Sequence, residues 1–431
     1  MNGRITYVLM CASILTSMVL PRSGTKIGGM PVTVPIILYL TLLFFWACRP
    51  LSQIKLDLRR KSVFEQLGIY GTLCYLVLGL LGVCIGLLRG PNFFHLFSHT
   101  APLVGFVPAL FLVREHVRDV RALRFMARMI VVSLVLVCLY GISQRIFGQA
   151  RVMVPGVTIS YADAFSPDPF ALKSNLTAVG LKVMSTFQNG NLFGNFLVLS
   201  VPLAIALATI SRGWSRLMYL IVSVLALANL MLTLSRGAIV AGMLSTLVVA
   251  WLLRPAKVPL CVAACFVAIG GALLYGLQLG ERLLTFDLTA GGRVPMWTEL
   301  ARKYSELSPG SFAFTFIAGS GMGAAVGTPS EPVVGTEGSL LMILLKMGVL
   351  GLLAFLTGVY GIARFAGWEH SPSLTPESAI ARGLAAGLIG AAIQFGVDSV
   401  MLLPPTAMNF WIVGGLALTA GSIARRRTAR A

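Results

Sequence analysis

Arg236 is a permanent cation in the middle of a long apolar stretch, within LTLSRGAIV (232–240). A charged side chain at the centre of a bilayer is costly, by about 3 to 17 kcal/mol. The chain must therefore either leave the membrane at 235–237 or use the charge for binding. Contact between Arg236 and lipid headgroups explains the residue equally well at this point.

Arg293 occurs in GGRVPMWTELARKY (291–304), where two glycines give a flexible turn and Pro295 favours the start of a helix. Trp297 lies on the apolar side of that helix, which predicts an amphipathic segment at the membrane surface. Backbone N–H groups at a helix start and a guanidinium group together suit a diphosphate. The alternative is an interfacial helix with three cations that only contact headgroups: Arg293, Arg302 and Lys303.

Glu337 stands directly before the apolar run GSLLMILLKMGVLGLLAFL (338–356). A carboxylate there commonly caps a helix or interacts with its dipole. The functional alternative is a general base at the membrane surface. Just upstream, Gly321 belongs to GSGMG (319–323), which has no strand and helix around it to indicate nucleotide binding. These glycines instead predict close approach of the backbone to a ligand or to another helix.

Polar side chains also occur inside apolar runs. Asn191 can cap a helix, and Asn195, one turn further on, could bind a sugar or a phosphate. Ionisable residues within a membrane are candidates for function, which applies to Lys346 and to Asp398, one turn after Gln394. An ion pair between Lys346 and Asp398 that holds two helices together is an equally good interpretation.

No metal site and no cofactor is expected. His95 and His99 are an i,i+4 pair without a third ligand, which is a poor basis for zinc. All seven cysteines fall in apolar runs, so they are interpreted as small buried hydrophobic residues without disulfides.

The composition requires membrane helices to position these residues. The 431 residues are 57% hydrophobic and 11% charged, and the mean hydropathy is +0.85. A soluble chain could not bury so much apolar surface, so an all-α, polytopic protein with a single integral membrane domain (1–431) is predicted. About twelve transmembrane helices are expected, at about 5–21, 31–48, 67–88, 97–113, 127–147, 192–210, 216–234, 237–253, 258–278, 338–363, 379–401 and 406–424.

The net charge of +19 comes from basic loops on alternate connections. By the positive-inside rule these loops and both termini face the cytoplasm, and no nucleic-acid partner is needed to explain the charge. Arg236, Arg293 and Glu337 then lie on the outer face, in a tight turn and in the longer of two outer loops, 148–191 and 279–337. Loops of that length are often functional.

The motifs occur in an order that resembles the O-antigen ligase and O-antigen polymerase superfamily. They are Asn191 to Asn195, SRGA (235–238), GGRVPMW (291–297), AGSGMG (318–323) and EGSLLMILLKMGVLGLLAFL (337–356). Members are bacterial inner-membrane glycosyltransferases that take a glycan from an undecaprenyl-diphosphate carrier at the periplasmic face. The resemblance implies that Arg236 and Arg293 bind the diphosphate, and no metal motif is visible. The residues expected to support this site are Asn191, Asn195, Ser235, Trp297, Gly321, Lys346 and Asp398.

One departure bears on the reaction. In the ligases, the position of Glu337 is normally a histidine in a His-Asn pair, whereas here the pair is Glu337-Gly338. Glu337 can still accept the proton of an acceptor hydroxyl, and the change favours a polymerase over a ligase that attaches glycan to lipid A–core. The expected partners are an undecaprenyl-diphosphate-linked glycan, a glycan or lipid A–core acceptor, and membrane lipid. A transporter or flippase for lipid-linked glycans is the alternative from another class, kept open by Lys346 and Asp398.

Overall fold

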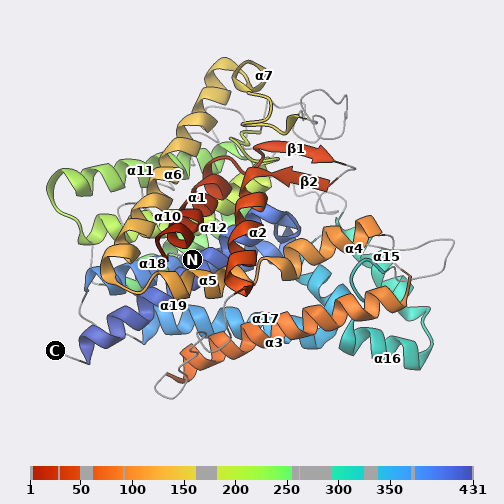
Figure 1. Cartoon of the computed structure of the whole chain (residues 1–431). Helices are drawn as coiled ribbons and strands as arrows, with labels where there is room; N and C mark the ends of the chain where they lie inside the picture. The colour runs from red at the N-terminus through yellow and green to blue at the C-terminus, as the bar shows by residue number, and fades with distance from the viewer. Residues whose placement is uncertain are drawn as a thin grey trace.

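The protein is a bundle of helices with one small β-hairpin (Figure 1). The computed structural model describes residues 3–27, 30–48, 62–90, 93–161, 182–254, 262, 293–324, 338–369 and 374–429. In chain order the elements are α1 (Gly3–Val19), β1 (Gly24–Ile27), β2 (Met30–Thr33), α2 (Val34–Ala47), α3 (Val63–Leu88), α4 (Phe93–Thr100), the π-helix η2 (Ala101–Gly105), α5 (Pro108–His116), α6 (Val120–Phe147), α7 (Gln149–Val152), α10 (Gly190–Ile210), α11 (Gly213–Leu232), α12 (Arg236–Leu252), α15 (Arg293–Ser305), α16 (Pro309–Ala318), α17 (Ser339–Trp368), α18 (Pro376–Val397), the 3-10 helix η3 (Val400–Leu402) and α19 (Pro404–Thr428).

Within the described ranges, 8 helical segments are long and apolar enough to cross a membrane, and α1, α2, α12 and α16 are shorter apolar helices. The chain is therefore a multi-pass, all-α membrane protein. Each expected span overlaps one or more helices except 258–278, which lies almost entirely outside the described residues. The total of twelve spans and the outer loop at 279–337 stay predictions.

Two expected spans differ in detail from the structure. Residues 31–33 form strand β2 instead of helix, because they pair with β1 in an antiparallel register that joins Thr33 to Gly24. The span expected at 97–113 is divided into α4, η2 and α5. Pro102 and Pro108 lie at these divisions, and proline removes a backbone donor and clashes with the preceding turn.

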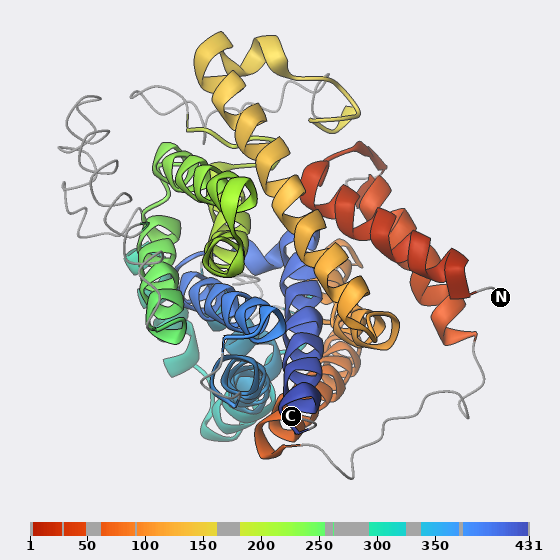
Figure 2. The same cartoon turned by 90° about the vertical axis from the view of Figure 1, so that its left-hand side faces the viewer.

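Glycines allow the long helices α3 and α17 to pack closely side by side (Figure 1). A Cβ at Gly71 would lie 2.5 Å from the backbone nitrogen of Gly358, and one at Gly361 would lie 2.3 Å from that of Gly68. Small residues at such spacing are typical of contacts between membrane helices. Figure 2 shows α19 passing through the middle of the bundle, in agreement with its almost entirely buried side chains.

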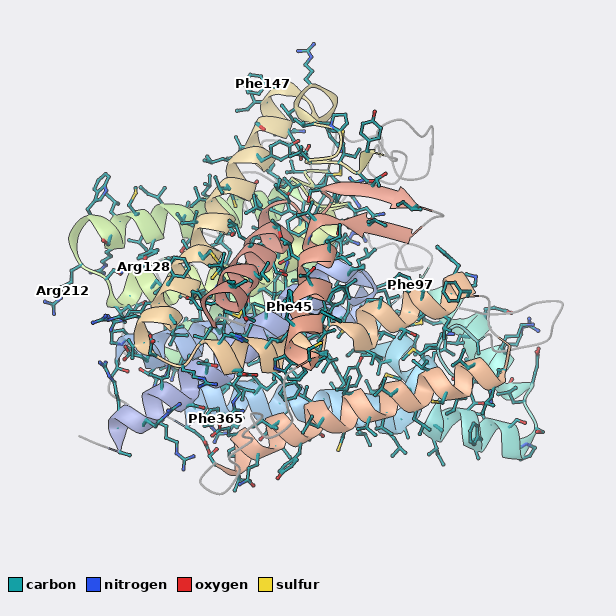
Figure 3. The ribbon with its side chains drawn as sticks, in the orientation of Figure 1. Phe45, Phe97, Arg128, Phe147, Arg212 and Phe365 are labelled. Atoms are coloured by element: carbon teal, nitrogen blue, oxygen red, sulfur yellow. The ribbon has the colours of Figure 1, made fainter. Side chains whose placement is uncertain are left out.

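Arginines gather at one end of the bundle. At this end Glu377, which is fully buried, accepts hydrogen bonds of 2.9 Å from both Arg124 and Arg427. Arg128 and Arg212 lie on the same side, at the left of Figure 3, whereas Phe97 lies on the opposite side. We call the end that contains Glu377 the basic end. It comprises the arginines of 114–128, 212–216 and 425–427. Three of the five expected basic loops group at this end, while 49–61 and 255–257 lie outside the described residues. The cytoplasmic location of this end stays a prediction.

Candidate functional site

Three helices begin, and one ends, at a common place away from the basic end. These are the starts of α10, α12 and α17 and the end of α18. The backbone N–H of Ser339 donates to the carbonyl of Asp398 at 3.1 Å. A Cβ at Gly237 would lie 2.6 Å from Oδ2 of the same aspartate. We call this place the helix junction, and it comprises residues 189–195, 233–237, 338–339 and 394–399.

Asp398 is the buried acid of the helix junction, with 2% of its surface exposed. Its Oδ2 accepts from Nε2 of Gln394 at 3.1 Å, and its Oδ1 lies 3.5 Å from the Nδ2 donor of Asn191. Gln394 in turn accepts from Nδ2 of Asn195 at 3.0 Å. A carboxylate is stabilised by amide donors and by the partial positive charge at helix starts. The network therefore provides the environment that a buried acid needs.

The structure corrects the expected roles of two asparagines. The cap of α10 is Asn189, whose Oδ1 accepts from the backbone N–H of Leu192 at 3.0 Å, and not Asn191. Asn191 instead lies one residue inside the helix and faces Asp398. Asn195 is fully buried, so its hydrogen bond to Gln394 links it to the acid, and it can affect a ligand only through that network.

Arg236 is the first residue of α12 and its side chain is exposed. The residues on either side of Arg236 have structural roles. Ser235 caps the helix by accepting from the backbone N–H of Ala238 at 3.3 Å. Gly237 leaves room for the carboxylate of Asp398. The arginine therefore lies directly after the short turn that joins α11 and α12, at the exposed surface of the helix junction. Its location on the outer face of the membrane stays a prediction.

The start of α17 is held by serines. Ser339 donates from Oγ to the carbonyl of Asp398 at 2.8 Å and accepts from the N–H of Met401 at 3.0 Å. Gly338 donates to Oγ of Ser399 at 2.9 Å and has a φ of 94° that favours glycine. Glu337, the residue before it, lies outside the described residues. Its role as a base stays a prediction. The structure describes Gly338, the residue that follows it.

The helix expected after the Gly-Gly turn is present as α15, which begins at Arg293. The Arg293 side chain lies outside the described part of the structure. A diphosphate site shared by Arg293 and Arg236 therefore stays a prediction. Arg302 pairs within the helix, with Glu299 at 2.6 Å and with Glu306 at 2.5 Å. Lys303 lies 3.8 Å and 3.7 Å from the same two carboxylates. Contact of these cations with headgroups, the alternative considered from the sequence, stays a prediction.

The apolar side of α15 contacts its neighbour α16, and its expected position at the membrane surface stays a prediction. Trp297 is half-buried, and the ring of Tyr304 packs edge-on against Phe312 of α16 at a centroid distance of 6.1 Å. Burial raises the pKa of Tyr304 to about 12, while the nearby charge of Arg89 acts in the opposite direction. Arg302 holds the pKa of Glu299 below its ordinary value through their hydrogen bond.

A second buried feature lies between α3 and α17, where residues 319–324 form what we call the glycine segment. The N–H groups of Ser320 and Gly321 donate to the carbonyls of Leu345 and Lys346 at 2.8 Å and 3.2 Å. These acceptors are free because Gly348, with a φ of 67°, interrupts α17. A Cβ at Gly321 would lie 2.4 Å from the backbone of α3. The expected close approach of the glycines to another helix is confirmed.

Lys346 is fully buried beside the glycine segment. Its Nζ donates to the carbonyl of Ala324, and the ion pair with Asp398 considered from the sequence is not formed. The ring of His99 stacks on that of His95, with the ring centroids 6.3 Å apart. Among the residues that the structure describes, no group of three or more His, Cys, Asp or Glu side chains could hold a metal ion.

Sequence reasoning missed Ser339 and Ser399 as members of the helix junction. Ser339 meets Asp398 across 59 positions of the chain, and Gly338 meets Ser399 across 61. No local pattern identifies such a contact, because each serine alone looks like an ordinary residue at a helix end. In the structure, the two serines are identified because the start of α17 lies against the end of α18.

No protein-family model matches this chain, and no curated protein matches it either. The resemblance to the O-antigen ligase and polymerase superfamily therefore depends on the order of the sequence motifs alone.

Proposed function

We propose that the protein is a glycosyltransferase of surface-polysaccharide or O-antigen biosynthesis. It moves a glycan from an undecaprenyl-diphosphate carrier to an acceptor sugar hydroxyl, at the membrane face opposite the basic end. The polymerase reaction, which joins repeat units, is preferred. On this proposal the protein lies in the bacterial inner membrane with both termini in the cytoplasm and the site facing the periplasm.

The observation that carries the proposal is the position of Arg236. Its exposed side chain stands at the start of α12, where the starts of α10 and α17 also converge. Helix starts and a guanidinium group both favour phosphate oxygens. Asp398 lies on the inner side of these helix starts and is buried, so a diphosphate has to bind on the outer side, where Arg236 is exposed.

The proposed mechanism is direct transfer. Arg236 and Arg293 hold the diphosphate and compensate the negative charge that grows on it as the bond to the anomeric carbon breaks. Glu337 accepts the proton of the acceptor hydroxyl, which attacks the anomeric carbon from the opposite side and inverts it. The amide network of Asn191, Gln394 and Asn195 keeps the start of α10 beside that of α12 through Asp398.

The start of α17 supports the polymerase over the ligase. A side chain at Gly338 would be strained at φ 94° and its Cβ would lie 3.2 Å from the carbonyl of Gly396. The asparagine that follows the ligase histidine would have to adopt that conformation here. The backbone of this chain is therefore adapted to the Glu337-Gly338 pair, and attachment of glycan to lipid A–core is the alternative.

A transporter of lipid-linked glycans is a second candidate, favoured by one observation. Transporters often place interrupted helices and polar groups at depth in the membrane. The interruption of α17 at Gly348 lies two residues from the fully buried Lys346. A transporter would move the lipid-linked glycan across a sealed bilayer, whereas a transferase would form product in detergent, where there are no two sides.

The test is reconstitution in detergent with undecaprenyl-diphosphate glycan and an acceptor glycan. We expect Arg236→Ala and Arg293→Ala to lower the rate by about a hundredfold or more, as loss of a donor to a developing anion does. Arg236→Lys should recover only part of it, because lysine lacks the bidentate fork. Arg212→Ala, at the basic end, is the matched control and should keep full activity.

Two results would contradict the proposal. Full activity in both outer arginine variants would remove the diphosphate role, and full activity in Glu337→Gln would remove the base. A strain lacking the protein separates the two transferase reactions. Short surface glycans indicate a polymerase, and unattached long glycans indicate a ligase.

A further inference from the structure

Among the described residues other than glycine, only Ser185 and Leu234 have a positive φ, and it is 52° for both. The left-handed conformation is unfavourable for a residue with a Cβ, and glycine and asparagine adopt it most readily. Such residues persist only where the surroundings hold them, and they gather at functional sites. Each of the two stands shortly before a helix that contributes to the helix junction.

The two residues lie in turns that contact each other. Residues 182–189 lead into α10 and residues 233–235 lead into α12. The N–H of Val183 donates to the carbonyl of Leu232 at 3.1 Å, and a Cβ at Gly190 would lie 2.6 Å from the carbonyl of Thr233. A change in the path of one turn must therefore displace the other.

The turn at Ser185 is held by α6. Oε1 of Gln144 accepts from the N–H of Ser185 at 2.8 Å, and Nε2 of Gln144 donates to its carbonyl at 2.8 Å. The hydroxyl of Ser185 donates to the carbonyl of Val137 at 2.6 Å. Gln144 is 4% exposed, so no solvent competes for these bonds. One buried side chain thus satisfies both backbone groups of a strained residue.

The turn at Leu234 ends α11 and starts α12 within three residues. The N–H of Leu234 donates to the carbonyl of Met231 at 3.1 Å, and the hydroxyl of Thr233 accepts from the N–H of Ser235 at 3.2 Å. A left-handed residue commonly ends a helix, and glycine is the usual choice. Here leucine has that conformation, two residues before Arg236. The first turn of α12 must then place Gly237 against Asp398.

We propose that Leu234 is a positioning residue for Arg236. Its left-handed backbone, locked by the contact of its turn with the turn that Gln144 holds, directs the guanidinium group toward the diphosphate of the lipid carrier. This inference rests on the proposed function and adds to it a set of residues that never touch the ligand. It requires that backbone conformation at 234, and not the leucine side chain, determines ligand affinity.

The test compares substitutions that differ in their tolerance of a positive φ. Leu234→Ile is β-branched and disfavours the conformation, whereas Leu234→Gly and Leu234→Asn accept it. Binding of undecaprenyl diphosphate is measured in nanodiscs, with undecaprenyl monophosphate as the comparison ligand and thermal unfolding as the check on folding. We expect Leu234→Ile to lose about tenfold in diphosphate affinity, which is about 1.4 kcal/mol. The glycine and asparagine variants should bind as the wild type does.

A second variant keeps the inference testable if Leu234→Ile does not fold. Gln144→Leu removes both hydrogen bonds between the Gln144 side chain and the backbone of Ser185, without a change at Leu234 itself. It should weaken diphosphate binding and leave the monophosphate affinity unchanged. Wild-type affinity in a folded Leu234→Ile, or an equal loss in the glycine, asparagine and isoleucine variants, overturns the inference. Arg236→Ala is measured in parallel. If it binds normally, the proposed function fails first; if it loses binding while Leu234→Ile and Gln144→Leu do not, only the positioning role fails.

Discussion

The helix junction contains one buried ionisable side chain, Asp398, and another, Lys346, is buried beside the glycine segment. The surroundings of the two side chains differ. Asp398 faces amide donors of Asn191 and Gln394 and lies beside the starts of α10 and α12. Lys346 makes one described hydrogen bond, to the carbonyl of Ala324, beside an interruption in α17. The acid is thus surrounded by groups that stabilise a negative charge, while the lysine has a single neutral acceptor.

The two regions also differ in what holds the chain together. In the helix junction, side chains make many of the contacts. Gly237 leaves room for the carboxylate of Asp398, and Gly338 leaves room for the carbonyl of Gly396. In the glycine segment the backbone itself makes the contacts, with positive φ at Gly319, Gly321 and Gly323. Substitutions in the glycine segment should therefore lower the stability most. Substitutions in the helix junction should lower it less and should also disturb the site.

The largest expected effect is that of Gly321→Ala. The new Cβ would lie 2.4 Å from the backbone of Gly86 at a φ of 90°, so both space and conformation oppose it. We expect a loss of stability of about 3 kcal/mol or more, at the upper end for one substitution. Thermal unfolding in detergent measures it. Gly310→Ala, where a Cβ meets nothing within 4 Å, is the matched control. Equal stability of the two variants would show that the backbone of the glycine segment is not tightly packed.

Asp398→Asn should have the next largest effect. The amide group keeps the shape of the side chain but replaces one of its two acceptor oxygens by a donor, so that either Asn191 or Gln394 loses its acceptor. Leaving buried donors unpaired costs about 1–3 kcal/mol, which lowers the unfolding temperature. Asp119→Asn is the control, because Asp119 only caps α6 and asparagine caps equally well. An unchanged unfolding temperature would mean that the acid is not the centre of the network.

Lys346→Met tests the other side of the comparison. Replacing a buried charge by an apolar side chain of similar size is often neutral or stabilising, by about 1–4 kcal/mol. We therefore expect no loss in the unfolding temperature, in contrast to Asp398→Asn, although one carbonyl loses its donor. A loss as large as that of Asp398→Asn would reveal a stronger interaction of the lysine and would erase the difference between the regions. Retained transferase activity in this variant would also count against the transporter.

The difference between the regions follows from how far their contacts reach along the chain. Apolar runs predict the spans, and Pro295 after two glycines predicts the start of α15, because hydropathy and helix initiation are local. The glycine spacing likewise predicts close backbone packing. The distant partner of Asp398 could not be predicted, since Asn191 lies 207 positions away. The cap at Asn189 was missed because Asn191 has the same local preference, and only the register of α10 separates the two.

Exposed charges complete the comparison and should give the smallest effect. Arg302 pairs with Glu299 and Glu306 on the surface of α15, where water and salt screen the attraction. The pKa of Glu299 is held below its ordinary value of 4.5, so its contribution to α15 is complete above that value and is lost as the pH falls through the lower, folded value. Glu299→Gln should therefore leave the unfolding temperature unchanged at pH 7 within error. Helicity of α15, followed by hydrogen exchange, should fall slightly below pH 4.5 in the wild type and remain flat in the variant. A marked loss in the variant at neutral pH would mean that this pair behaves like the buried acid of the helix junction, and exposure would no longer explain which charges matter.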